Sequence, residues 1–68
     1  MNKELTENQI NAKSLIIGRE LERTNWYDMT GSESWKWCIE KAKQSGAISL
    51  IDQEKIAYNA MMYVANGH

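Results

Sequence analysis

The sequence has no proline and only one cysteine and one histidine among its 68 residues. Cys38 therefore has no partner for a disulfide within the chain. A structural zinc ion needs four ligands, and beside Cys38 only His68 supplies a ligand of the usual kind. Chains this short bury only about 60% of their unfolded surface and usually need disulfides, a metal or a second subunit. The remaining route to added stability is association with another protein or with a second copy.

Long apolar runs are also missing, and the aliphatic run at residues 15–17 is short. A membrane span needs about 18 apolar residues, and residues 1–4 lead into polar sequence without the apolar segment of a signal peptide. The content of 43% hydrophobic and 25% charged residues is ordinary for a globular protein. We expect no contact with a membrane. We expect a cytoplasmic location, because a single unpaired cysteine suits a reducing compartment.

Neither sign of charge is in excess, since the net charge is −1. Residues 1–31 hold four basic and five acidic side chains, and residues 32–68 hold four of each. Nucleic-acid binding needs a basic face to neutralise phosphates, and a mimic of DNA needs an acidic field. Neither kind of partner is expected from this balance.

Capping signals and apolar periodicity predict three helices, at about 6–24, 32–45 and 50–65. Thr6 and Gln9 have the spacing of a capping box, and either Thr30 or Ser32 can cap the second helix. Gly46 suits the position after a helix end. The third start is the weaker capping-box pattern with an acidic residue, Ser49 and Asp52. These signals predict a single all-α domain over residues 1–68, either a three-helix bundle or an orthogonal three-helix array.

Helical spacing assigns one apolar stripe to each helix. Gly18 lies beside the first stripe, either to permit close packing or as a tolerated surface glycine. Cys38 lies on the second stripe without a histidine or basic cluster nearby, so we interpret it as a buried hydrophobe and not as a nucleophile. The predicted core comprises Ile10, Ile17, Leu21, Trp35, Cys38, Ile39, Ala42, Leu50, Ile56, Ala57, Ala60, Met61 and Val64.

Several large apolar residues are left over by these stripes. Two lie opposite the first stripe, Trp37 points away from Trp35, and the third helix has a second apolar arc beside its core arc. The connecting segment 24–32 also contains large apolar side chains and is expected to fold back over the core. The resulting candidates for partner binding are Leu15, Ile16, Trp26, Tyr27, Trp37, Tyr58 and Met62. The alternative for these residues is ordinary packing, with the segment 24–32 covering Trp37.

An enzyme needs a nucleophile with its base, paired carboxylates in a cleft, a metal or a phosphate cradle. The sequence shows none of these patterns, and its carboxylates fall at helix starts and on polar faces. We expect no catalysis, no cofactor, no metal and no small-molecule substrate.

A helix-turn-helix transcriptional regulator is the alternative, because residues 32–65 have that outline. Gln53 and Asn59 could contact adenine edges, and lysines 36, 41, 43 and 55 could contact phosphates. Asp52 and Glu54 at the front of the third helix argue against it.

The function that the sequence favours is a small non-catalytic protein–protein interaction module: an adaptor, an inhibitor or a regulatory subunit. Its partner would be another protein or a second copy of the chain. Short chains of this type are often encoded by phages or mobile elements and act on a host protein.

Overall fold

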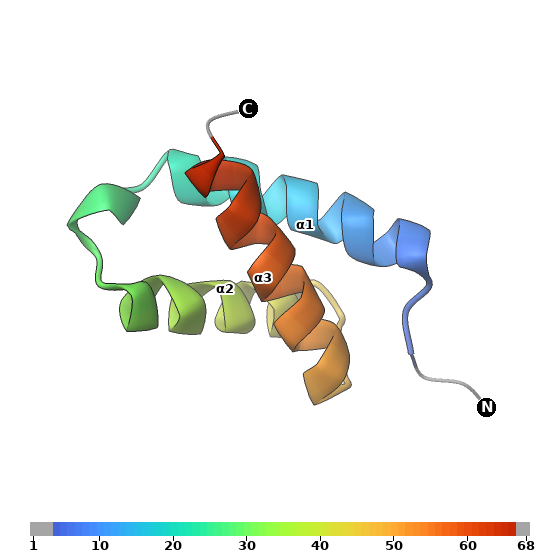
Figure 1. Ribbon diagram of the computed structural model, residues 1–68. Coiled ribbons are helices and arrows are strands. Elements are labelled where there is room, and N and C mark those ends of the chain that lie inside the picture. The colour runs from blue at the N-terminus through green and yellow to red at the C-terminus, as the bar shows by residue number, and fades with distance from the viewer. Residues whose placement is uncertain (1–3, 67–68) are drawn as a thin grey trace.

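The computed structural model describes residues 4–66 and contains three α-helices packed against one another. The helices are α1 (Glu7–Glu22), α2 (Gly31–Gln44) and α3 (Leu50–Ala65), with a 3-10 turn, η1 (Trp26–Asp28), between the first two. Figure 1 shows α3 crossing α1 and α2. α3 packs against both, whereas α1 and α2 contact each other much less. The predicted all-α three-helix bundle is confirmed, and the helix bounds agree with the sequence within two residues.

Two of the helix starts are reciprocal capping boxes. At α1 the Gln9 N–H donates to the Thr6 hydroxyl at 3.2 Å, and the Thr6 N–H donates to the Gln9 side chain at 2.9 Å. At α2 the Glu33 N–H donates to the Thr30 hydroxyl at 3.1 Å, and the Thr30 N–H donates to the Glu33 side chain at 2.8 Å. Thr30 is therefore the cap of α2, which begins one residue before the predicted position.

The start of α3 differs from the expected capping box. Ser49 accepts from the Asp52 N–H at 3.4 Å, but the Asp52 carboxylate does not return to Ser49. It accepts instead from the backbone N–H of Leu5 at 2.8 Å, and Asp52 is buried. The acidic residue thus fastens the segment before α1 to the first turn of α3, across 47 positions of sequence.

The core is formed mainly where α3 lies against the other two helices. Small side chains at its centre allow the helices to approach, and Gly18 of α1 lies directly against Tyr63 of α3. The sequence left the role of Gly18 open, and close packing is the one the structure supports. The buried apolar residues are Ile10, Ile17, Leu21, Cys38, Ala42, Ala47, Ile56, Ala57, Ala60 and Val64.

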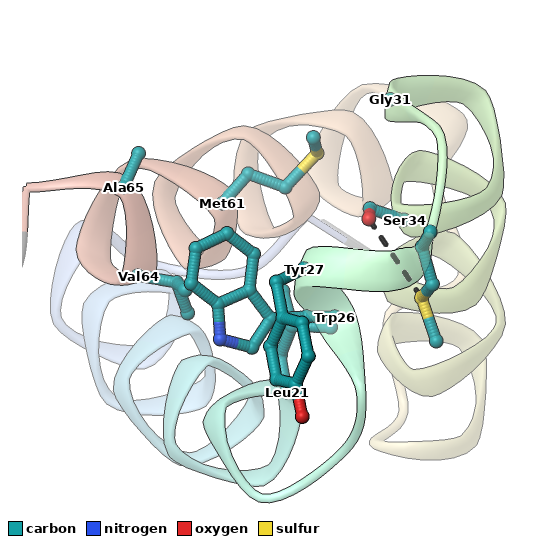
Figure 2. A pocket seen from close by; sticks show the side chains of 9 residues that line it. Leu21, Trp26, Tyr27, Gly31, Ser34, Met61, Val64 and Ala65 are labelled. Atoms are coloured by element: carbon teal, nitrogen blue, oxygen red, sulfur yellow. Dashed lines mark hydrogen bonds between the residues drawn. The ribbon is translucent and has the colours of Figure 1, made fainter.

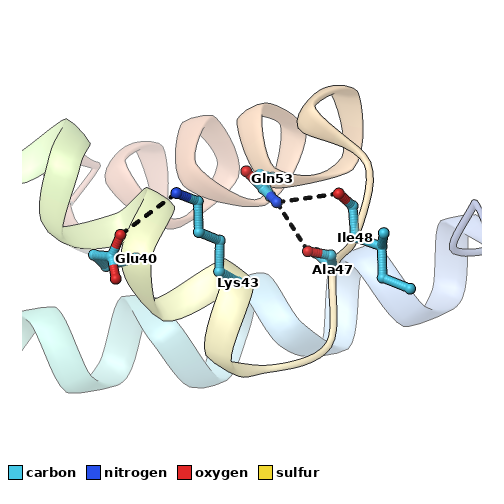
Figure 3. Close-up of polar contacts among 5 residues, drawn as sticks. All are labelled: Glu40, Lys43, Ala47, Ile48 and Gln53. Carbon is cyan, nitrogen blue, oxygen red and sulfur yellow. Dashed lines mark hydrogen bonds and ion pairs between the residues drawn. The ribbon is translucent and has the colours of Figure 1, made fainter.

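The link between α2 and α3 is held by side chains from α1 and α3. Gly46 has a φ of 107°, a conformation that favours glycine, and ends α2 as predicted. Gln53 is buried and donates to the carbonyls of Ala47 and Ile48 at 3.0 and 3.3 Å, as Figure 3 shows. Lys13 donates to the carbonyl of Ser45. These bonds satisfy carbonyls that the turn would otherwise leave unpaired.

Four predicted core residues are in fact exposed or only partly buried. Leu50 is 63% exposed, and Trp35, Ile39 and Met61 lie at the edge of the core. The prediction for Leu50 was wrong because Asp52 and Gln53 occupy the inward positions in the first turn of α3. A purely apolar pattern cannot anticipate polar residues at inward positions.

No helix within residues 4–66 is long and apolar enough to cross a membrane. His68, the only histidine of the sequence, lies outside the described residues.

Candidate interaction surface

The residues predicted for partner binding do not form one surface. Trp26 and Tyr27 line a pocket beside η1, and Tyr58 lines a groove near the start of α3. Leu15 and Ile16 are exposed on α1, by 39% and 59%, and Met62 is 38% exposed on α3. Trp37, which the sequence left either packed within the chain or free for a partner, is partly buried against the core.

Trp37 is covered partly by the core and partly by its own helix. The Lys41 ammonium nitrogen lies 5.3 Å from the centre of the Trp37 ring, within the range of a cation–π contact. The two residues are one helical turn apart on α2, so the lysine stem also lies along the ring. The ring that appeared surplus in the sequence is therefore occupied within the chain.

The pocket beside η1 has a volume of about 210 Å³. Figure 2 shows the rings of Trp26 and Tyr27 between the ends of α1 and α3. The two rings meet edge to face, with centres 6.3 Å apart. Sites for small molecules usually measure about 300–1,000 Å³, so this pocket has room for no more than a side chain. It is lined by Leu21, Trp26, Tyr27, Met29, Gly31, Ser34, Met61, Val64 and Ala65.

The segment that carries this pocket folds back over the core, as the sequence predicted. Trp26 and Met29 pack against the buried cluster, while Tyr27 remains 70% exposed. The Ser34 hydroxyl lies 3.7 Å from the sulfur of Met29, which places that sulfur beside the first turn of α2. The segment thus covers one end of the bundle and leaves Tyr27 at its surface.

A larger hollow lies around Trp35 and is lined mainly by α2 and the first half of α3. It consists of two adjoining depressions, of about 640 and 430 Å³, which share Trp35 and Glu54. We call the whole hollow the Trp35 groove. Its lining comes from all three helices: Glu7, Ile10, Trp35, Lys36, Ile39, Glu40, Lys43, Leu50, Ile51, Glu54, Lys55, Tyr58 and Asn59.

The Trp35 groove contains most of the strongly exposed aliphatic surface of α3. Leu50 and Ile51 are 63% and 57% exposed, and Tyr58 is exposed two helical turns beyond the pair. Half-buried Trp35 and Ile39 form the apolar side contributed by α2. Trp35, Ile39 and Leu50 were not predicted as surface residues, because all three lie on the apolar stripes that the spacing assigns to the core. The only signal in the sequence for this exposure is the pair of polar residues Asp52 and Gln53, which occupy the inward positions of the first turn of α3.

Charged residues line the two banks of the Trp35 groove unequally. The bank on α2 carries two lysines and one glutamate: Lys36, Glu40 and Lys43. The opposite bank on α1 and α3 carries two glutamates and one lysine: Glu7, Glu54 and Lys55. The formal charges are thus +1 and −1. The Glu40–Lys43 ion pair seen in Figure 3 spans 3.5 Å between exposed groups, where such pairs contribute little stability.

Cys38 is the only thiol of the sequence, and it is buried. Burial raises the pKa of the Cys38 thiol from its ordinary 9.0 to about 11, which disfavours the nucleophilic thiolate. Among residues 4–66, no cluster of three or more His, Cys, Asp or Glu side chains is arranged to hold a metal ion.

The helix-turn-helix alternative placed Gln53 and Asn59 at base edges. The Gln53 amide is buried and donates to the link before α3, so it cannot reach a base edge. The role suggested by the sequence for Gln53 was therefore wrong. Asn59 is half-buried at the Trp35 groove.

The fold defines a small three-helix bundle with a groove lined by all three helices. No protein-family model, curated protein or solved structure matches the chain. Its function must therefore be inferred from its own residues.

Proposed function

We propose that the protein is a non-catalytic protein–protein interaction module, an adaptor, inhibitor or regulatory subunit, that docks through the Trp35 groove. One observation carries this proposal. Leu50, Ile51 and Tyr58 are more than half exposed on one side of half-buried Trp35. The residues that a folding core would normally hide are gathered here around a tryptophan.

The composition of the groove supports docking over simple solvent exposure. Single exposed apolar residues are common, but groups of them around a concave surface usually mark binding sites. Tryptophan and tyrosine are enriched among the residues that contribute most to binding. Charged residues surround the apolar centre, as the polar rim of an interface does.

This proposal moves the docking site away from part of the surface that the sequence favoured. Trp37 is engaged by Lys41 and the core, and the pocket between Tyr27 and Met61 is small. Leu15 and Ile16 form a separate exposed pair on α1 and are outside the Trp35 groove. A substitution at Ile16 is therefore a control for a substitution inside the groove.

Two matched substitutions test the proposal. Ile51 is 57% exposed in the groove and Ile16 is 59% exposed outside it, so Ile51→Glu and Ile16→Glu differ in location much more than in exposure. The wild-type chain and both variants are immobilised and exposed to an extract of the source cell. We expect a protein retained by the wild type and by Ile16→Glu to be lost with Ile51→Glu.

The opposite pattern, in which Ile16→Glu abolishes retention and Ile51→Glu does not, would contradict docking through the groove. Equal retention of the same proteins by all three chains would contradict it as well. Circular dichroism of both variants checks that each remains helical.

A further inference from the structure

We propose that the apolar surface of the Trp35 groove is covered by the same surface of a second copy, related to the first by a two-fold axis that runs along the groove. This inference rests on the proposed function, because it assigns an occupant to the same surface. In such a dimer the apolar residues of each copy, chiefly Trp35, Leu50 and Ile51, would cover those of the other.

The charges on the two banks favour a second copy as the occupant. A two-fold axis that runs along the groove brings each bank of one copy against the opposite bank of the other, whereas an axis across the groove would bring like banks together. The α2 bank, with Lys36 and Lys43, would then face the bank with Glu7 and Glu54. Charges of +1 and −1 meet at both ends, so the groove is complementary to itself.

Other partners match this pattern less well. A nucleic acid would be attracted by one bank and repelled by the other, and so would a strongly basic or acidic peptide. A second copy carries both signs at the required places. Its net charge of −1 also adds little repulsion between copies.

The described residues together expose enough surface for an interface of standard size, which would have to extend over the banks of the groove. A standard interface takes about 800 Å² from each partner. The described residues expose 4,702 Å² in total, of which that area is about a sixth. Both depressions, which involve all three helices, would have to contribute.

Dimerisation would also supply the stability that so short a chain lacks. The only cysteine is buried and free, so no disulfide within the chain restrains it. Binding of a second folded copy stabilises the folded state by mass action, and the stability then rises with protein concentration.

The first experiment measures the mass in solution over a series of concentrations by light scattering or sedimentation equilibrium. We expect the wild type to approach twice the 7.9 kDa of one chain. Ile51→Glu should weaken the dimer by more than about tenfold, because it places a charge among desolvated central residues. Ile16→Glu should associate like the wild type.

The second experiment reverses the charge of one bank at a time. One variant carries Lys36→Glu with Lys43→Glu, and the other carries Glu7→Lys with Glu54→Lys. Each variant alone should be monomeric, because both of its banks then have the same sign. An equimolar mixture of the two should form heterodimers, and a chain with all four substitutions should again form homodimers. Only a two-fold arrangement of opposed banks predicts this restoration.

A wild-type chain that stays monomeric at every concentration would overturn the dimer. The proposed docking to another protein would then be tested separately by the capture experiment. A dimer that is weakened by Ile16→Glu but not by Ile51→Glu would overturn the groove as the dimer interface. Failure of the charge-reversed mixture to form heterodimers would overturn the two-fold arrangement. Capture of a different protein through the groove by a strictly monomeric chain would support the proposed function and reject the second copy.

Discussion

Gly18 has no side chain at the point where Tyr63 of α3 packs against α1. A Cβ atom added at Gly18 would be 2.7 Å from the Tyr63 Cδ1 atom and 3.2 Å from its Cβ atom. The nearer parts of Tyr63 are not the free end of a flexible chain, so one helix would have to move. This contact explains why a residue with poor helix propensity occupies the middle of a 16-residue helix.

Gly18→Ala is expected to destabilise the protein. Alanine gains up to about 1 kcal/mol of helix propensity, but overpacking of this kind costs about 1–3 kcal/mol. Gly31→Ala is the control, because nothing lies within 4 Å of a Cβ atom there. Urea denaturation measures both. In a Tyr63→Ala background the sign should reverse and Gly18→Ala should stabilise; destabilisation that persists there would refute the steric explanation.

Cys38 gives the protein a stability that depends on pH in the alkaline range. Its folded pKa of about 11 exceeds the ordinary 9.0, so the unfolded chain loses the thiol proton at lower pH. This contribution is constant below pH 9 and decreases as the pH rises towards 11, by about 1.4 kcal/mol per unit. The free energy of unfolding of the wild type is compared with that of Cys38→Ala at each pH. The difference separates the thiol contribution from those of lysines and tyrosines, which both proteins share. Parallel curves for the two proteins between pH 9 and 11 would contradict it.

At the scale of the elements, the first turn of α3 connects parts of the chain that are far apart in sequence. Asp52 accepts from the Leu5 backbone, and Gln53 donates to the two carbonyls of the preceding link. Both side chains are buried with their polar groups paired. Two consecutive polar residues therefore position α1 and α2 relative to α3.

Asp52→Ala is expected to cost about 1–3 kcal/mol, since it removes the acceptor of a partly buried N–H group. Asp52→Asn should cost less, because its amide oxygen retains an acceptor of similar shape. Amide exchange at Leu5 should accelerate more in Asp52→Ala than in Asp52→Asn. Unchanged exchange at Leu5 in both variants would show that the bond contributes nothing to the segment before α1.

Gln53→Glu is expected to be more damaging than its size suggests. It replaces the donor with a carboxylate oxygen that faces the carbonyls of Ala47 and Ile48. A buried polar group without a partner costs about 1–3 kcal/mol, and a charged one costs more. Gln44→Glu makes the same chemical change at an exposed site and should cost less than about 1 kcal/mol. Thermal denaturation of the two variants compares them, and equal losses would argue against the role of the Gln53 amide.

The sequence predicted the helices well because their ends depend on local bonds. The Thr6 and Thr30 caps join residues three apart, and such spacing can be identified without knowledge of the fold. The groove could not be identified in this way. Whether Leu50 is inward or outward depends on Asp52, whose partner lies 47 residues away. The rotation of α2 likewise left both Trp35 and Trp37 half-buried, which periodicity cannot resolve.

At the scale of the whole molecule, the balance of charge predicts an absence of tight DNA binding. The lysines of α2 are interspersed with Glu33 and Glu40, and the front of α3 is acidic. A mobility-shift assay at about 150 mM salt should therefore detect no sub-micromolar complex with duplex DNA; non-specific binders have dissociation constants near 10⁻⁴–10⁻⁶ M. A tight, sequence-dependent shift would contradict this prediction and revive the helix-turn-helix alternative.

The position of α3 as the helix that holds the other two has a consequence for biosynthesis. α1 and α2 contact each other little, so a nascent chain that has reached the link after α2 has almost no surface on which to pack them. Short isolated helices are only marginally stable in water. Folding on the ribosome should therefore wait until α3 has left the exit tunnel and then proceed in one step. Until that moment, proteases and chaperones would meet an unfolded polypeptide.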